Sequence, residues 1–196
     1  MAKFKEIEIK WDATNVDRTA FNKAVRRYAK GKKTRFISVA GFDYYHESPE
    51  GYVARHRHGS TTNELTVKAR VSKKSTTIRR EINLKLAKET SPIQVQELMT
   101  ELGFRNCLPI FKDCDIYFIQ DGKYTVDIVW YKVSCQDKPP KNFIEVEVHE
   151  APVKESLKIL EKWTKFVESL GAGAVMPLSL WEIYSGRQYR MSRNRK

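Results

Sequence analysis

Cysteine is scarce in this sequence of 196 residues, and no long hydrophobic run interrupts it. The three cysteines, Cys107, Cys114 and Cys135, are an odd number without a Cys-x-x-Cys pair, which argues against a disulfide framework or a structural zinc site. No stretch approaches the ~18 apolar residues of a membrane-spanning helix, and the N-terminus has no apolar stretch of signal-peptide length. We therefore expect a cytoplasmic protein with reduced thiols.

Acidic residues are also few relative to basic ones, because 24 Asp and Glu stand against 36 Lys and Arg, a net charge of +12. This excess favours an anionic partner, and nucleic acid, an anionic membrane surface and free phosphate compounds all satisfy it. The length suffices for one hydrophobic core. We expect a single domain over residues 1–186 and a basic tail at residues 187–196.

Several segments alternate between apolar and charged residues with a period of two, which predicts β-strands. They are FKEIEIKW (4–11), YVARHRH (52–58), ELTVKARV (64–71), TTIRREINLKL (76–86), KYTVDIVWYKV (123–133) and NFIEVEV (142–148). Helical spacing and capping residues predict helices over 14–30, from Ser91 to Gly103, and over 153–170. The pattern is that of an α+β protein dominated by antiparallel strands.

The charged faces of these strands contain pairs of like charge. Each pair occupies one strand face: Glu6 with Glu8, Arg55 with Arg57, and Glu145 with Glu147. For any one strand, a half-exposed sheet whose polar side faces water explains the alternation. Like charges two residues apart repel, however, unless something binds between them. Paired carboxylates suit Mg²⁺ or Mn²⁺, and paired arginines suit phosphate. If the sheet closes on itself, these faces meet inside a barrel whose apolar outside is covered by the three helices.

The segments resemble, in order, the CYTH superfamily, also called the triphosphate tunnel metalloenzymes. Glu6-Ile7-Glu8-Ile9-Lys10 is similar to the family's N-terminal Glu-x-Glu-x-Lys signature. The similar motifs that follow, over residues 6 to about 170, are Asp43-Tyr44-Tyr45, Arg55-His56-Arg57, Leu65-Thr66-Val67-Lys68, Arg79-Arg80-Glu81, Lys112, Asp127 and Glu145-Val146-Glu147. The resemblance implies a closed antiparallel eight-stranded β-barrel, a triphosphate tunnel, with a polar charged interior and helices packed outside.

The resemblance also implies a site. Its phosphate-binding residues would be Lys10, Arg55, Arg57, Lys68, Arg79 and Lys112. Its ligands for Mg²⁺ or Mn²⁺ would be Glu6, Glu8, Glu145 and Glu147, with Asp127 in support. Lys10 and Glu81 would be catalytic, although Lys10 could equally position the attacking water or hold phosphate. The metal would neutralise phosphate oxygens and activate water, while the basic groups would stabilise the transferring phosphoryl group.

Three positions depart from the family pattern. Asn83 stands where a second Glu often follows Arg-x-Glu, and His46 where an acidic residue often follows Asp-x-Tyr. Cys114 stands where an Arg often ends a Lys-x-Arg motif, so one phosphate ligand is missing and the length of polyphosphate that is bound stays open. None of these departures alters the N-terminal signature.

Other polar residues have both a functional and a structural interpretation, and for each we favour the structural one. His56 and His58 could bind zinc but have no third ligand nearby. His46 or His149 could act as a general acid or base. Cys114 could be a nucleophile, but no Cys–His arrangement can be inferred.

The sequence therefore predicts metal-dependent hydrolysis of inorganic triphosphate or a nucleoside triphosphate. The alternatives are cyclisation of ATP to cyclic AMP and pyrophosphate, as in class IV adenylate cyclases, hydrolysis of RNA 5′-triphosphate ends, and non-catalytic binding of a nucleotide or polyphosphate. The basic tail mildly favours RNA, although such tails more often only increase solubility. We expect a small-molecule triphosphate or nucleotide as partner, an RNA 5′ end as the alternative, no membrane, and a monomer or homodimer.

Overall fold

The computed structural model describes residues 5–50, 52–72, 75–149 and 151–187; for residues 5, 6, 68–72, 75–81 and 106 the description covers the backbone alone. Eight strands lie within these ranges: β1 (Lys5–Asp12), β2 (Thr34–Glu47), β3 (Val53–Gly59), β4 (Asn63–Ser72), β5 (Ser75–Lys85), β6 (Asn106–Asp121), β7 (Tyr124–Cys135) and β8 (Lys138–His149). The helices there are α1 (Arg18–Tyr28), α2 (Pro92–Glu101), α3 (Val153–Ser169) and α4 (Leu180–Ser185).

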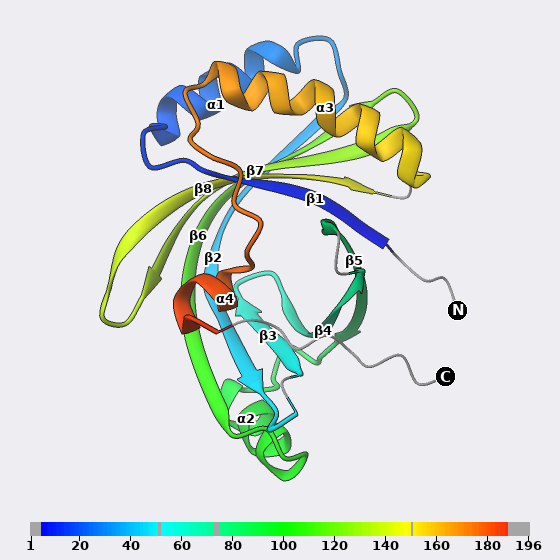
Figure 1. Ribbon diagram of the computed structural model, residues 1–196. Coiled ribbons are helices and arrows are strands. Elements are labelled where there is room, and N and C mark those ends of the chain that lie inside the picture. The colour runs from blue at the N-terminus through cyan, green and yellow to red at the C-terminus, as the bar shows by residue number, and fades with distance from the viewer. Residues whose placement is uncertain (1–4, 51, 73–74, 150, 188–196) are drawn as a thin grey trace.

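All neighbouring strands pair antiparallel, in the order β1-β5-β4-β3-β2-β6-β7-β8, and β8 pairs in turn with β1 (Figure 1). The ladders differ greatly in length. β2 pairs with β6 along its whole length, from Thr34–Ile119 to Glu47–Asn106. In the described part of the chain, β1 pairs with β5 only at Lys5–Arg80, Glu6–Arg79 and Ile7–Ile78. The cycle of strands is therefore joined through a short seam.

The prediction of a barrel that is closed along its length is wrong. From Glu8 to Asp12, β1 pairs with β8, and from Ile82 to Lys85, β5 pairs with β4. Because strands twist, β1 moves away from β5 after the seam and runs beneath α1 and α3 (Figure 1). The eight strands thus form a strongly curled antiparallel sheet that is open along most of this side.

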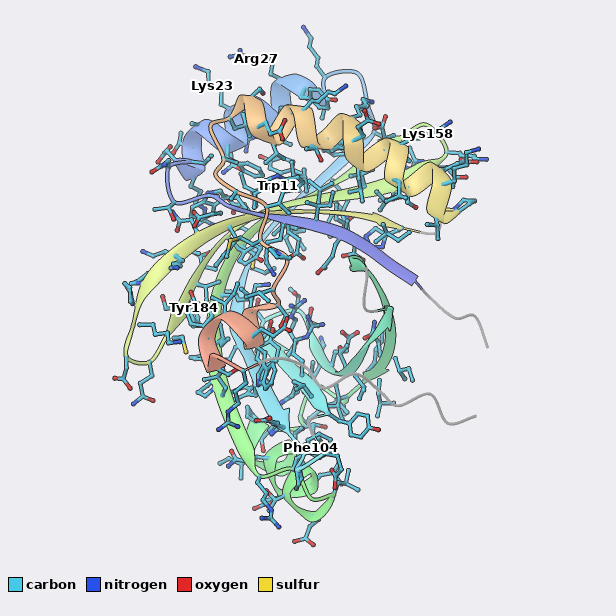
Figure 2. All side chains as sticks on the ribbon, in the orientation of Figure 1. Trp11, Lys23, Arg27, Phe104, Lys158 and Tyr184 are labelled. Carbon is cyan, nitrogen blue, oxygen red and sulfur yellow. The ribbon has the colours of Figure 1, made fainter. Side chains whose placement is uncertain are left out.

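Two of the helices cover the convex face of the sheet. The apolar residues of α3, including Leu160, Trp163 and Val167, join Phe21 and Val25 of α1 in the largest core cluster. Figure 2 shows Trp11 of β1 inside this layer, while Lys23, Arg27 and Lys158 point outward from the helices. The three helices predicted from spacing and caps are confirmed, with ends shifted by up to four residues.

The fourth helix, α4, was not predicted and lies on the concave side. Its Leu180, Trp181 and Tyr184 pack with Tyr131 and Phe143 in a second core cluster. Glu182 and Ser179 form a capping box at its start, which satisfies the backbone N–H groups there. Most of the predicted basic tail, residues 188–196, lies outside the described residues. None of the described helices is long and apolar enough to cross a membrane.

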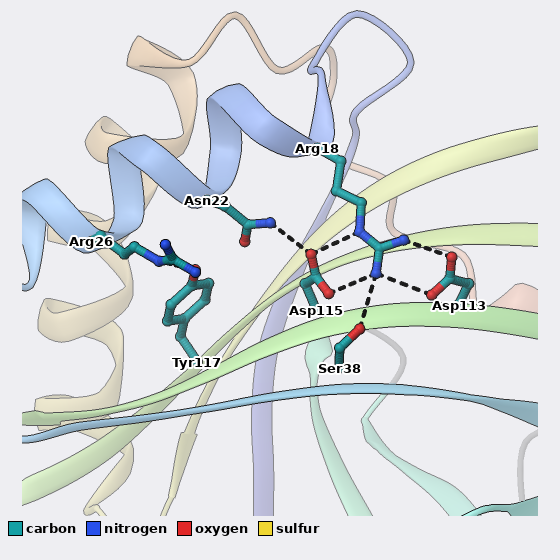
Figure 3. A network of polar contacts seen from close by, with 7 residues as sticks. All are labelled: Arg18, Asn22, Arg26, Ser38, Asp113, Asp115 and Tyr117. Carbon is teal, nitrogen blue, oxygen red and sulfur yellow. Dashed lines mark hydrogen bonds and ion pairs between the residues drawn. The ribbon is translucent and has the colours of Figure 1, made fainter.

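A partly buried ion-pair network anchors α1 to the sheet (Figure 3). The Arg18 guanidinium donates to Asp115 Oδ2 at 2.7 Å, Asp113 Oδ2 at 2.7 Å and Ser38 Oγ at 3.1 Å. Asn22, one turn further along the helix, donates to the same Asp115 carboxylate at 2.7 Å. Hydrogen bonding from Arg18 outweighs burial and lowers the pKa of Asp115 to about 2. The start of α1 is thereby held against β6 and β2.

Candidate functional site

The curled sheet encloses a cavity of about 350 Å³ on its concave side. Strand alternation points every second residue into this space. The cavity is lined by eight of the residues singled out from the sequence: Glu8, Lys10, Arg55, Arg57, Lys112, Asp127, Glu145 and Glu147. The side chains of the other four, Glu6, Lys68, Arg79 and Glu81, lie outside the described residues.

Carboxylates from three adjacent strands lie in one row. Glu8 of β1 pairs in register with Glu147 of β8, which pairs in turn with Asp127 of β7. Glu145, two residues before Glu147, pairs with Lys10. Glu8 and Lys10 are buried, at 6% and 4% exposure. Like charges directly opposite one another on a sheet repel, so this row costs stability unless a cation lies beside it.

Basic side chains occupy a separate part of the wall, on β3 and β6. Arg57 forms a two-pronged contact with Asp43, from Nε to Oδ1 at 2.8 Å and from Nη2 to Oδ2 at 3.0 Å. Burial alone would raise the pKa of Asp43, but Arg57 and Arg55 outweigh it and hold that pKa below its usual value. The ionised Asp43 therefore fixes Arg57, whose side chain stays 35% exposed.

Arg55 is held by a second acceptor pair on β4. Its Nη2 donates to Thr66 Oγ1 at 3.2 Å and lies 3.9 Å from Glu64 Oε1. Thr66 in turn donates to Glu64 Oε1 at 3.1 Å. Both arginines are thus oriented by neighbours before any ligand binds, which lowers the entropy cost of binding an anion.

Tyr131 of β7 contacts the acidic and the basic parts of the wall. Its hydroxyl donates to Glu145 Oε2 at 3.0 Å, and Lys112 Nζ lies 4.1 Å from the centre of its ring. Burial, together with the negative charges of Glu145 and Glu8, raises the pKa of Tyr131 well above its usual value. The phenol therefore stays protonated and remains a hydrogen-bond donor to Glu145.

The donor set suits a hard divalent cation. Among the described residues, no group of three or more His, Cys, Asp or Glu side chains is arranged to hold a metal ion. Mg²⁺, however, commonly takes one or two protein carboxylates and completes its shell with water and substrate phosphate. Asp127 Oδ1 is buried and has no hydrogen-bond partner in the described part of the chain, so one oxygen is available for such an ion. His149 Nε2 lies 2.9 Å from the other oxygen of that carboxylate, Oδ2.

Comparison with known proteins decides the family. A sequence model of the CYTH domain matches residues 4–175. This chain belongs to the CYTH domain family. A search of curated proteins gives no significant match.

Solved structures show the same fold as this CYTH protein. The PH1819 protein of Pyrococcus horikoshii OT3 is 23% identical, with a TM-score of 0.65 over 93% of this chain and 99% of that one. The PH1012 protein of the same organism is 20% identical, with a TM-score of 0.63 over 90% and 98%. A Bacillus halodurans protein described as a candidate adenylate cyclase is 15% identical, with a TM-score of 0.55 over 94% and 98%.

Sequence reasoning missed several residues that shape the cavity of this CYTH protein. Tyr131 follows Asp127 at a spacing of four on β7, so the same alternation could have placed it inside. Asp43 was quoted as part of a motif, but its contact with Arg57 depends on the pairing of β2 with β3. Glu64, whose carboxylate accepts from Thr66, was likewise not predicted as a site residue.

The cavity is also less polar than predicted. Apolar side chains line it beside the charged groups, among them Ile37, Val39, Ile116, Phe118 and Val129. Four of these five come from β2 and β6, which were not among the strands predicted from alternation. The predicted polar charged interior is therefore in fact a mixed one, partly charged and partly apolar.

The remaining polar residues have structural partners or surroundings. His56 is fully buried, and its Nε2 lies 2.8 Å from Asn63 Oδ1. His46 is 3% exposed, and burial lowers its pKa to about 4, so the ring is neutral near pH 7. Burial likewise raises the pKa of Cys114 and keeps this cavity thiol protonated.

Proposed function

We propose that this CYTH protein hydrolyses a triphosphate-containing substrate, inorganic triphosphate or a nucleoside triphosphate, with the help of Mg²⁺ or Mn²⁺. One observation carries the proposal. A single cavity holds a row of carboxylates on β1, β8 and β7 and a separate set of oriented basic side chains on β3 and β6. A chain of phosphates with associated metal ions has the complementary pattern of charge.

The basic residues would bind and orient the phosphate chain. Arg55 and Arg57 present forked N–H donors suited to phosphate oxygens, and Lys112 adds a point charge. Lys10 completes this set, and we assign Lys68 and Arg79 to it from the family motif. Holding the phosphates in line with an attacking water would supply much of the rate enhancement.

The carboxylates Glu8, Asp127, Glu145 and Glu147, with Glu6 from the same signature, would hold the metal. When bound there, a divalent ion supplies Lewis-acid stabilisation of phosphate charge and lowers the pKa of a water ligand. Tyr131 fixes the orientation of Glu145 through its hydroxyl. Lys10, which pairs with Glu145, would orient the water, and Glu81 would take its proton.

The test is product identification with a matched pair of variants. The protein is incubated with inorganic triphosphate or ATP and Mg²⁺, and all products are identified by phosphorus NMR. We expect orthophosphate release that falls by a factor of about 100 or more in Glu8→Gln. It should be unchanged in Glu161→Gln, which changes an exposed residue of α3.

Other products would redirect the assignment. Cyclic AMP with pyrophosphate from ATP would contradict hydrolysis and establish a cyclase. Release only from RNA 5′-triphosphate ends would identify an RNA triphosphatase. Binding without any turnover would identify a protein that sequesters nucleotide or polyphosphate.

A further inference from the structure

Five of the apolar residues in the cavity wall, Ile37, Val39, Ile116, Phe118 and Val129, form one continuous strip. Ile37 of β2 pairs in register with Ile116 of β6, which pairs with Val129 of β7. Val39 and Phe118 lie two residues from Ile37 and Ile116, so alternation places them on the same face. Such an apolar surface does not stabilise bound phosphate, because phosphate oxygens are stabilised by charge and hydrogen bonds.

The strip begins where the arginine-bearing strand ends. The last residue pair between β2 and β3 is Gly41–Gly59, and β2 continues for seven further residues, Thr34–Ala40. Figure 1 shows β2 and β6 extending past β3 toward α1 and α3. A ligand lying along β2 would therefore contact Arg57 beside Asp43 and, nearer to Thr34, the apolar strip.

Only part of the strip packs in the hydrophobic core of the protein. All five side chains are half-buried. Val39, Ile116 and Val129 also pack against the core cluster beneath α4, whereas Ile37 and Phe118 belong to no core cluster among the described residues. The guanidinium carbon of Arg35 lies 4.0 Å from the centre of the Phe118 ring. Arg35 and Phe118 thus form a cation–π pair at the outer end of the strip, which suits contact with a flat ring.

We propose that this strip is a subsite for the organic group of the substrate, and that the group is a flat aromatic one such as a nucleobase. The inference rests on the proposed function. It narrows the substrate from triphosphates in general to organic triphosphates that carry an aromatic group. The phosphates would lie against Arg55, Arg57 and Lys112, and the aromatic ring against Ile37, Ile116 and Phe118. The cavity volume of about 350 Å³ lies within the ~300–1,000 Å³ range of small-molecule sites.

The test compares binding of two ligands that resist hydrolysis, the diimido analogue of ATP and diimidotriphosphate, by calorimetry with Mg²⁺ present. The wild-type protein should bind the ATP analogue more tightly. Phe118→Ala and Ile37→Ser should each weaken the ATP analogue by roughly tenfold. Both variants should leave diimidotriphosphate within about twofold of wild type.

Matched variants on the outer face separate this effect from general destabilisation. Phe42→Ala and Ile82→Ser remove side chains that are 41% and 63% exposed, and neither should change the binding of either ligand. Equal affinity of the wild-type protein for the two ligands, or equal weakening of both by Phe118→Ala, would overturn the subsite while leaving the proposed function intact. If neither ligand binds the wild-type protein, the proposed function and the subsite both fail.

Discussion

At the scale of single residues, the cavity is organised by side chains that hold other side chains. Asp43 fixes Arg57, Thr66 fixes Arg55, and Tyr131 fixes Glu145. Such supporting contacts matter because an active group must be held near its productive geometry before the substrate arrives. Tyr131 is a positioning residue in this account, since it acts through Glu145.

Tyr131→Phe tests that role, because it removes the hydroxyl and keeps the ring beneath Lys112. We expect the Mg²⁺ concentration for half-maximal activity to rise by a factor of about 10–100, as is common when a residue behind a metal ligand is changed. A Mg²⁺ titration of triphosphate hydrolysis measures this. Tyr44→Phe, on the outward face of β2, is the control. An unchanged titration curve in Tyr131→Phe would show that Glu145 needs no such support.

At the scale of elements, Arg18 makes the ionic contact between α1 and the sheet. Arg18 bridges Asp113 and Asp115, and Asp115 is only 3% exposed. The folded-state pKa of Asp115, about 2, lies below its ordinary 3.8. The ionised carboxylate therefore stabilises the fold above pH ~3.8, and this contribution is lost as the pH falls toward 2.

Arg18→Gln should lower the free energy of unfolding by roughly 2–3 kcal/mol at pH 7, because it leaves Asp115 buried without its main partner. This estimate is below the usual cost for a buried pair, since Arg18 is one-third exposed. Urea unfolding from pH 7 downward measures the effect, and the difference from wild type should shrink between pH ~3.8 and 2. Adding Asp115→Asn should recover part of the loss. A difference that is constant over this pH range would contradict the ion-pair account.

The sequence predicted the strands and helices that can be identified from the spacing of neighbouring residues. Period-two alternation identified the inward faces of β1, β3 and β8 because a strand's side chains must point to opposite sides. Spacing and caps identified α1, α2 and α3. The helix α4 was missed because its six residues, Leu180–Ser185, are too few to show helical periodicity.

Features that depend on distant parts of the chain could not be predicted in the same way. The short seam between β1 and β5 follows from the register and twist of the whole sheet. The Arg18 network joins residues 95 and 97 positions apart. The apolar strip arises because Ile37, Ile116 and Val129, unremarkable in sequence, are brought side by side by strand pairing.

At the scale of the whole molecule, the charged groups are divided between two faces. The helix layer turns basic residues such as Lys23, Arg27 and Lys158 outward (Figure 2), whereas the concave side gathers the carboxylates and arginines of the cavity. The net charge of +12 favours the approach of polyanions in general. Under the proposed function, selectivity for a triphosphate with its metal would come from the cavity, where both signs of charge lie.

The most direct test of this account is orthophosphate release from inorganic triphosphate by metal-stripped protein, measured before and after Mg²⁺ or Mn²⁺ is restored. We predict no release from the stripped protein and full recovery with either ion, because the carboxylate row and the basic side chains must act together across the cavity. Release that persists in excess chelator, or a protein that stays inactive on this substrate and on ATP after the metal is restored, would contradict the central claim.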